Sequence, residues 1–217
     1  MVNPWENLDL EIYQNYTKSI KQYQKLNQIM KGQCKSYNFK SVAIWGAGDG
    51  NGLEYLSCKR FKNIYAIDIN EEYLKECENK NSNLECLHTE KIDLSDTFVE
   101  LPHVNMVIAD LIIEFLGVDT FISQIKNQLI NNGKSSKPLK IISCVIENKK
   151  DTFDSNSKYA NELTGISNIW KSVDELGLIV KLAAINFDLD LKEVYTLGNK
   201  EFIRLDFKQV KNVPDDI

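Results

Sequence analysis

Short apolar runs alternate with helix-like spacings through the middle of the chain. Five runs have the length and composition of strands, and several are apolar on both faces, as in a buried parallel sheet: Ser41–Trp45, Asn63–Asp68, Leu84–His88, Val104–Ala109 and Lys140–Ile146. Alternating strands and helices imply right-handed crossovers between parallel strands. The pattern predicts an α/β fold with a doubly wound, mostly parallel sheet and helices on both faces.

Helix boundaries stand between these strands. Asn51, Asn70 and Asp119 are N-cap residues in front of helical apolar spacings, and Gly133 ends the last of these helices. Each predicted helix therefore connects two neighbouring strands of the sheet.

The carboxyl-terminal third predicts a different arrangement. A helix around Ile169–Leu176 is expected to end at Gly177, followed by strands at Leu178–Phe187 and Glu201–Phe207. The short connection between these strands predicts an antiparallel pair at the edge of the sheet.

Two stretches flank the predicted core. Ile20, Tyr23, Leu26 and Met30 have the spacing of one helix face within the first 40 residues. Glu147–Asn168 is polar and has no period, and loops of that length are usually functional. We therefore expect a single domain with four parts, namely a helical cap at 1–40, a core at 41–146, a loop and helix at 147–177, and a strand pair at 178–209.

Composition narrows the possible partners. The 217 residues include 26 Lys and Arg against 31 Asp and Glu, a net charge of −5, and no basic block, so a nucleic-acid partner is not expected. No apolar run reaches the roughly 18 residues that a membrane span needs, and the amino-terminal stretch is acidic and aromatic, unlike a signal peptide. We expect a cytoplasmic monomer or homodimer.

The cysteines and histidines do not indicate a metal centre. The five cysteines, at positions 34, 58, 77, 86 and 144, form no C-x-x-C pair, and there are only two histidines. We expect reduced cysteines that act as small apolar residues, and no metal.

A glycine-rich turn follows the first strand. Gly46, Gly48 and Gly50 give a G-x-G-x-G pattern, and such turns let a ligand approach the backbone. The dinucleotide pattern G-x-G-x-x-G fails, because Asn51 or Leu53 stands where its third glycine belongs. A nicotinamide-dependent reductase is therefore a disfavoured alternative.

With this turn, the chain resembles class I S-adenosylmethionine-dependent methyltransferases over about residues 41–146, and the resemblance implies their Rossmann-like fold and their cofactor, S-adenosylmethionine. It assigns the turn to the methionine part of the cofactor, Asp68 to the ribose hydroxyls, and Asp93 with Leu94 to the adenine, and it places Ile69 among the cofactor contacts. The residues so assigned are Gly46, Ala47, Gly48, Gly50, Asp68, Ile69, Asp93 and Leu94.

One position departs from the family. Many members carry an acidic residue two positions before the first glycine, near the cofactor's ammonium group, and this chain has Ile44 there. Asp49, Asp110 or backbone carbonyls are the candidates that remain for that group.

The resemblance implies methyl transfer by in-line displacement, which needs alignment and a dry pocket, and in some members a base. Asp110, Glu114 and Glu147 follow the fourth and fifth strands and are the candidate catalytic residues, although helix-start carboxylates explain them equally well. His88 and His103 are expected to be structural or exposed. Glu147 and Asn148 are also weakly similar to the metal site of metal-dependent O-methyltransferases, but we expect no metal.

A small-molecule acceptor is expected. The run Ala109–Ile112 stands where methyltransferases of nucleic acid or protein glutamine carry Asn-Pro-Pro-Tyr. Tyr13 and Tyr16 in the cap and Tyr159 and Trp170 after the core are the candidate substrate contacts. A binding module that holds the cofactor without chemistry is the main alternative, and the acceptor's identity stays open.

Overall fold

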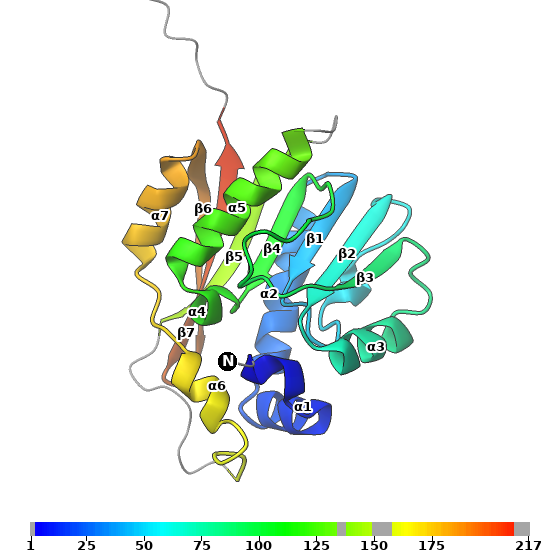
Figure 1. The fold of residues 1–217 in the computed structure, drawn as a ribbon, viewed down its shortest axis with the longest axis vertical. Coiled ribbons are helices and arrows are strands. Elements are labelled where there is room, and N and C mark those ends of the chain that lie inside the picture. The colour runs from blue at the N-terminus through cyan, green and yellow to red at the C-terminus, as the bar shows by residue number, and fades with distance from the viewer. Residues whose placement is uncertain (1–2, 134–137, 149–157, 211–217) are drawn as a thin grey trace, which may run out of the picture.

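The computed structural model describes residues 3–133, 138–148 and 158–210. They form a seven-stranded sheet with the order β3-β2-β1-β4-β5-β7-β6 (Figure 1). The first five strands are parallel, and β7 is antiparallel to both β5 and β6. The strands are β1 Ser41–Trp45, β2 Asn63–Asp68, β3 Leu87–Lys91, β4 Met106–Asp110, β5 Ile141–Asn148, β6 Phe187–Leu197 and β7 Lys200–Gln209. The predicted doubly wound sheet with a terminal antiparallel pair is confirmed.

Helices cover both faces of the sheet (Figure 1). They are η1 Pro4–Asn7, α1 Leu10–Ser19, α2 Gln22–Ser36, η2 Leu53–Tyr55, α3 Glu71–Lys80, α4 Ile113–Leu116, α5 Val118–Gly133, α6 Thr164–Ile169 and α7 Glu175–Ala183. In β1, Ala43 and Trp45 pack in the core with α5 and α7, whereas Val42 and Ile44 pack in the core with α2 and α3. Alternate side chains of one strand therefore serve two cores, which explains its continuous apolar run.

The segment after the glycine turn is not the predicted α-helix. It makes only the single turn η2, and the Asn51 side chain binds the backbone carbonyl of Tyr23 instead of capping a helix. Gly52 has a φ of +91°, and a Cβ there would lie 2.5 Å from Met30 Cγ. Left-handed backbone packed against α2 stops helical propagation here. Asp119 is not the N-cap of α5, because the helix begins at Val118 and Asp119 is the second residue of its first turn.

The carboxyl-terminal elements are shifted from their predicted places. Residues 178–183 belong to α7, in which Gly177 is an interior residue, and the strand pair occupies 187–209 instead of 178–209. Leu178 and Leu182 are buried four residues apart, as on one helix face. Strand β6 is largely exposed at the sheet edge, and its apolar residues alternate with polar and charged ones instead of forming a continuous apolar run.

Two of the five cysteines form a disulfide, and the prediction of reduced thiols is wrong for this pair. Cys58 precedes β2 and Cys86 precedes β3, and the pairing of these parallel strands brings the two Cα atoms to 5.5 Å. Spacing in the sequence could not reveal this proximity, because it follows from the strand order. Cys34, Cys77 and Cys144 are free and buried, as predicted.

The amino-terminal segment is two helices instead of one. Lys21 has a φ of +57° and separates α1 from α2, so Ile20 ends the first helix while Leu26 and Met30 belong to the second. Figure 1 places η1 and α1 beside the lower end of the sheet, between α6 and α3. Of the predicted loop at 147–168, residues 149–157 lie outside the described part of the chain.

A search of the described helices for an apolar stretch long enough to cross a membrane finds none.

Candidate active site

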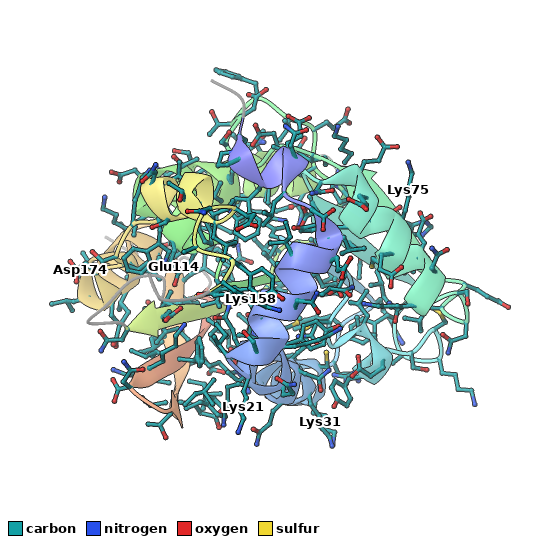
Figure 2. All side chains as sticks on the ribbon, turned by 90° about the horizontal axis from the view of Figure 1, so that it is seen from below. Lys21, Lys31, Lys75, Glu114, Lys158 and Asp174 are labelled. Atoms are coloured by element: carbon teal, nitrogen blue, oxygen red, sulfur yellow. A yellow bond between two sulfur atoms is a disulfide. The ribbon has the colours of Figure 1, made fainter. Side chains whose placement is uncertain are left out.

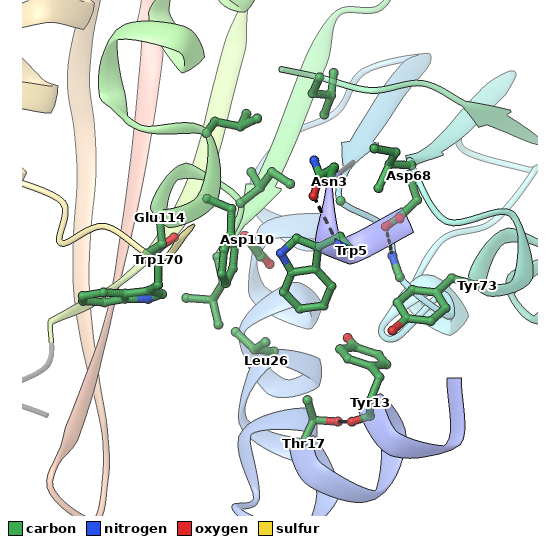
Figure 3. A pocket seen from close by; sticks show the side chains of 18 of the residues that line it. Asn3, Trp5, Tyr13, Thr17, Leu26, Asp68, Tyr73, Asp110, Glu114 and Trp170 are labelled. Atoms are coloured by element: carbon green, nitrogen blue, oxygen red, sulfur yellow. Dashed lines mark hydrogen bonds between the residues drawn. The ribbon is translucent and has the colours of Figure 1, made fainter. Parts of the chain in front are cut away.

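A pocket lies at the carboxyl ends of the parallel strands (Figure 3). Residues that directly follow β1, β2, β3 and β4 line it, and η1, α1 and Trp170 contribute further walls. The ends of parallel strands are where open α/β sheets bind ligands. The lining residues with polar or aromatic side chains are Asn3, Trp5, Tyr13, Tyr16, Thr17, Gln22, Asp68, Tyr73, Asp93, Ser95, Asp110, Glu114, Phe115, Glu147, Trp170 and Lys200, and Gly46 and Gly48 also line the pocket.

Asp68, the last residue of β2, is joined to the glycine turn. Its Oδ2 accepts a hydrogen bond from the backbone N–H of Gly48 at 2.8 Å, and its Oδ1 accepts one from the N–H of Asn70 at 2.9 Å. Burial raises the pKa of the Asp68 carboxyl, and these backbone donors oppose that rise. The carboxylate is thus held in one orientation, with lone pairs left for two further donors such as vicinal hydroxyls.

The rest of the glycine turn divides between the pocket and the cap. Gly46 and Gly48 line the pocket, whereas Ala47, Asp49 and Gly50 are not among its described lining residues. The Asp49 carboxylate is fully buried and accepts a hydrogen bond from Gln14 Nε2 at 2.7 Å, beside Lys80. Asp49 therefore anchors α1, and its place does not support the predicted contact with an ammonium group.

Asp93 stands in the loop after β3. Its Oδ1 accepts hydrogen bonds from the backbone N–H of Ser95 at 2.9 Å and from the Ser95 hydroxyl at 2.7 Å. The carbonyl of Leu94 accepts a hydrogen bond from Gln124 of α5 at 2.9 Å, which holds the loop on the sheet. Asp93, Leu94 and Ile69 all line the pocket, and their contact with a cofactor stays a prediction.

Asp110 ends β4 in the middle of the pocket (Figure 3). Its Oδ1 accepts a hydrogen bond at 2.7 Å from Nε2 of Gln33, a fully buried residue of α2. Burial raises the pKa of Asp110 to about 7, and the bond from Gln33 opposes that rise. Ile44 packs in the core with α2 and α3 and is not among the described residues that line the pocket.

Glu114 of α4 is the most secluded carboxyl group in the pocket. It is 1% exposed, and its Oε1 accepts a hydrogen bond from the backbone N–H of Glu147 at 2.7 Å. Among the described residues, its Oε2 has no hydrogen-bond partner. Burial raises the pKa of Glu114 to about 8, and the charges of Glu147 and Asp110 contribute. A buried polar oxygen without a partner costs about 1–3 kcal/mol, so Glu114 is a candidate functional residue.

Glu147, at the end of β5, forms an ion pair with Lys200 at 3.0 Å. The neighbouring Asn148 side chain is exposed and donates to Glu201 at 3.3 Å, away from this pair. Within the described ranges, no group of three or more His, Cys, Asp or Glu residues is arranged to hold a metal ion.

Aromatic residues of the amino-terminal helices cover the pocket on the side that faces away from the strand ends. Tyr13 stacks on Tyr73 of α3 with ring centres 5.0 Å apart, and Trp5 meets Phe115 of α4 edge to face at 4.9 Å. In Figure 2, which shows this side of the molecule, α1 lies between α6 and α3. Leu8, Tyr16, Leu163 and Ile166 join the amino-terminal helices to α6 in a small apolar cluster. The two segments outside the predicted core thus form one cap.

Residues 45–136 match the family model described as a methyltransferase domain. This part of the chain, which contains the glycine turn, Asp68, Asp93 and Asp110, is therefore similar to a methyltransferase domain. A comparison with curated protein sequences finds no match.

Solved structures share the methyltransferase fold at low identity. An S-adenosylmethionine-dependent methyltransferase from Clostridium acetobutylicum ATCC 824 is 15% identical, with 93% of this chain and 98% of that chain covered and a TM-score of 0.63. Magnesium protoporphyrin IX methyltransferase from Synechocystis PCC 6803, with its bound cofactor, is 11% identical, with 88% and 80% covered and a TM-score of 0.58.

S-adenosylmethionine is the cofactor of this methyltransferase class, and the described residues fit it. Gly48 has a φ of +54°, and a Cβ there would come within 3.1 Å of the Tyr13 hydroxyl, so a larger residue would fill the space beside Asp68. Asp68 offers acceptors for a ribose, and Asp93 offers one for an amino group.

The predicted acceptor contacts are only partly brought together. Tyr13, Tyr16 and Trp170 line the pocket, whereas Tyr159 packs in the cap cluster and is not among the described lining residues. His88 stacks on Tyr65 at the exposed surface, and the backbone carbonyl of His103 accepts a hydrogen bond from Ser41 at the opposite edge of the sheet. The histidines are structural or exposed, as expected.

Sequence reasoning missed Trp5, Gln33, Tyr73 and Phe115. Trp5, Tyr73 and Phe115 line the methyltransferase pocket, and Gln33 holds Asp110. Each lies on a helix whose sequence pattern indicates only packing against the sheet. Trp5, an isolated tryptophan in a polar segment, is the one residue of the four whose sequence context could have indicated a site.

Proposed function

We propose that the chain transfers a methyl group from S-adenosylmethionine to a small molecule held between the strand ends and the cap. One observation carries the proposal. A single pocket joins Asp68 and Asp93, which suit a nucleoside, to Glu114, which has an unpartnered buried oxygen. Figure 3 draws Asp68 and Tyr73 on one side of the pocket and Glu114 and Trp170 on the other, with Asp110 between them.

The cofactor would lie at the Asp68 end. Gly46 and Gly48 would receive its methionine part, Asp68 its ribose, and Asp93 with Leu94 its adenine, while Asp110, held by Gln33, would face its ammonium group. The bound cofactor supplies an electrophilic methyl group on a sulfonium.

The protein's own contribution is enclosure and alignment. Trp5 and Tyr13 cover the pocket and exclude water, and Trp170 with Glu114 would orient the acceptor. The pocket is closed by its cap, and the net charge of −5 opposes a nucleic-acid acceptor. These features support a small acceptor. We keep 41–146 as the cofactor-binding core, and 1–40 with the segment around α6 as its cap.

Calorimetric titration with S-adenosylhomocysteine tests the cofactor site. We expect binding by the wild type and about 10-fold or greater weakening by Asp68→Asn, because hydrogen bonds to a charged group contribute about 1.5–3 kcal/mol. The matched control is Glu72→Gln, an exposed carboxylate on α3. Absence of binding by the wild type, or equal binding by Asp68→Asn, contradicts the proposed cofactor site.

Incubation with methyl-labelled cofactor and pools of small molecules tests the chemistry. Transfer of label to any acceptor supports an enzyme. Binding of the cofactor product without transfer across amine, hydroxyl, thiol and carbon acceptors would favour a binding module. Binding of NADH in place of the adenosyl compounds would favour a reductase.

A further inference from the structure

We propose that the acceptor is a protonated amine with an apolar or aromatic body, and that Glu114 binds its ammonium group and takes its proton. The inference rests on the proposed methyl transfer and names the substrate class of the same site. Its experiments separate a failure of the amine from a failure of the cofactor.

The first observation is the unpartnered oxygen. Glu114 Oε1 is occupied by the backbone N–H of Glu147, whereas Oε2 lies in the pocket wall, is buried, and has no partner among the described residues. A carboxyl oxygen in this condition needs a donor from a ligand. The backbone N–H of Lys171 donates a hydrogen bond to the Glu114 carbonyl at 2.7 Å, and this bond holds the backbone of Glu114 in place.

The second observation is the sign of the charge in the pocket. Asp68, Asp93, Asp110, Glu114 and Glu147 line it, and Lys200 is the cation among the described lining residues. Lys200 is already paired with Glu147. The field in this low-dielectric space therefore attracts a cation and repels a carboxylate or phosphate ligand.

The third observation is the nature of the walls around Glu114. Trp170 lies beside it in Figure 3, and Phe115, Leu116 and Leu163 also line the pocket. Aromatic faces attract ammonium groups, and aliphatic walls bind the apolar body of a ligand. A ligand with an ammonium group and an apolar body would donate a hydrogen bond to Glu114, match the negative charge of the pocket, and pack against its apolar and aromatic walls.

The chemistry balances without another reactant. The ammonium N–H bond breaks and its proton moves to Glu114 Oε2, which leaves a neutral amine with a free electron pair. The nitrogen then forms a bond to the methyl carbon while the carbon–sulfur bond breaks, and that electron pair stays on sulfur as a neutral thioether. The methylated nitrogen carries the positive charge that the sulfonium lost. A raised carboxyl pKa makes Glu114 a stronger base for the first transfer.

Binding of three probes of similar shape tests the inference. We would titrate 2-phenylethylamine, 2-phenylethanol and phenylacetate into the protein saturated with S-adenosylhomocysteine. We expect the amine to bind at least 10-fold more tightly than the alcohol, and the carboxylate to bind most weakly. Equal or tighter binding of the alcohol or the carboxylate overturns the amine proposal.

Proton release gives a readout that does not depend on activity. At pH 6.5 the Glu114 carboxyl holds a proton, because burial raises its pKa to about 8, and an arriving ammonium group must displace that proton. Calorimetry of 2-phenylethylamine in two buffers of different ionisation enthalpy measures the release. We expect release by the wild type and a marked reduction in Glu114→Gln, in which the amide oxygen can still accept from the Glu147 N–H.

Two controls keep the outcomes separate. Glu162→Gln changes an exposed carboxylate in the cap and should bind the amine as the wild type does. Glu114→Gln should still bind S-adenosylhomocysteine, which shows that it folds. If S-adenosylhomocysteine binds the wild type and none of the three probes does, the amine inference fails while the methyltransferase proposal stands. If S-adenosylhomocysteine itself fails to bind, the methyltransferase proposal fails.

Discussion

Gly48 combines two requirements that a side chain cannot meet. Its φ of +54° lies in the left-handed region, and a Cβ there would approach the Tyr13 hydroxyl to 3.1 Å. Its N–H also holds Asp68 in place at 2.8 Å. Gly48 therefore determines the backbone conformation of the turn, the packing of the cap against it, and the orientation of the Asp68 carboxylate.

We expect Gly48→Ala to lower the free energy of unfolding by about 1–2 kcal/mol, the cost of left-handed backbone for a residue with a Cβ. Binding of S-adenosylhomocysteine should weaken as well, because Tyr13 must move. Urea unfolding and calorimetry measure the two effects. Gly133→Ala is the matched control, since nothing lies within 4 Å of a Cβ there, and a loss of stability as large in that variant would refute this explanation.

Among the elements, the amino-terminal helices depend on a few polar tethers. Gln14 of α1 donates to the buried Asp49, and Asn70 at the start of α3 donates to the carbonyls of Trp5 and Leu8, each at 3.0 Å. These bonds fasten the cap to the same turn and strand end that line the pocket. Opening of the cap and access to the pocket are therefore coupled.

Gln14→Ala should loosen α1 without disturbing the sheet. We expect faster hydrogen exchange across residues 10–19 and several-fold faster dissociation of S-adenosylhomocysteine, because a covering element sets the release rate. Asn15→Ala, on the exposed side of the same helix, should change neither quantity. Equal exchange rates in the Gln14 and Asn15 variants would show that this tether does not hold the cap.

The Cys58–Cys86 disulfide ties the segment before β2 to the segment before β3, at the edge of the sheet opposite the pocket. We expect Cys58→Ser to lower the free energy of unfolding by about 2–4 kcal/mol under oxidising conditions, through the loop-closure entropy of the unfolded chain. Affinity for S-adenosylhomocysteine should stay unchanged.

A thiol count in denaturant checks the disulfide directly. The oxidised protein should show three thiols, from Cys34, Cys77 and Cys144, and the reduced protein all five. Five thiols before reduction would show that the pair is open, as a reducing cytoplasm would favour.

At the scale of the whole molecule, folding buries several carboxyl groups at one end of the sheet. The pKa of Asp110 rises to about 7 and that of Glu114 to about 8, both chiefly by burial. Glu147 and Asp110 are the charged neighbours of Glu114, and Lys200 is paired with Glu147. The folded protein therefore holds protons that the unfolded chain has already lost above about pH 4 to 5. A cationic ligand would stabilise the ionised form of these buried carboxyl groups.

Stability should therefore fall as pH rises from 5 to 8. Each raised carboxyl group contributes stability that is complete below its ordinary pKa and is lost as pH passes its folded pKa, by roughly 1 kcal/mol per pH unit. Urea unfolding at pH 5.5 and 7.5 measures the slope. In Glu114→Gln, the free energy of unfolding should change less with pH than it does in the wild type. A wild-type free energy of unfolding that increases with pH would contradict these pKa directions.

Much of the cofactor end could be predicted from the chain alone. The strands at 41–45 and 63–68 lie where their apolar runs indicate. Asp68 ends β2, Gly46 directly follows β1, and Gly48 and Asp93 lie within three residues of a strand end. A residue next to a buried parallel strand is placed by that strand, so local pattern suffices. The predicted strand at 84–88 begins three residues late, and the edge strand β6 was missed, because exposure weakens the apolar signal.

The acceptor end was decided by tertiary structure. Glu114, Gln33, Trp5 and Trp170 come from four separate segments, and no spacing in the sequence relates them. The same holds for Cys58 and Cys86, which meet only because β2 and β3 are neighbours. Local periodicity and turn residues by themselves determined the sheet and the end of the pocket that contains the glycine turn, Asp68 and Asp93, since strands and turns depend on short-range backbone preferences. Packing of helices over the strand ends determined which carboxyl group is buried without a partner, because burial is a property of the assembled fold.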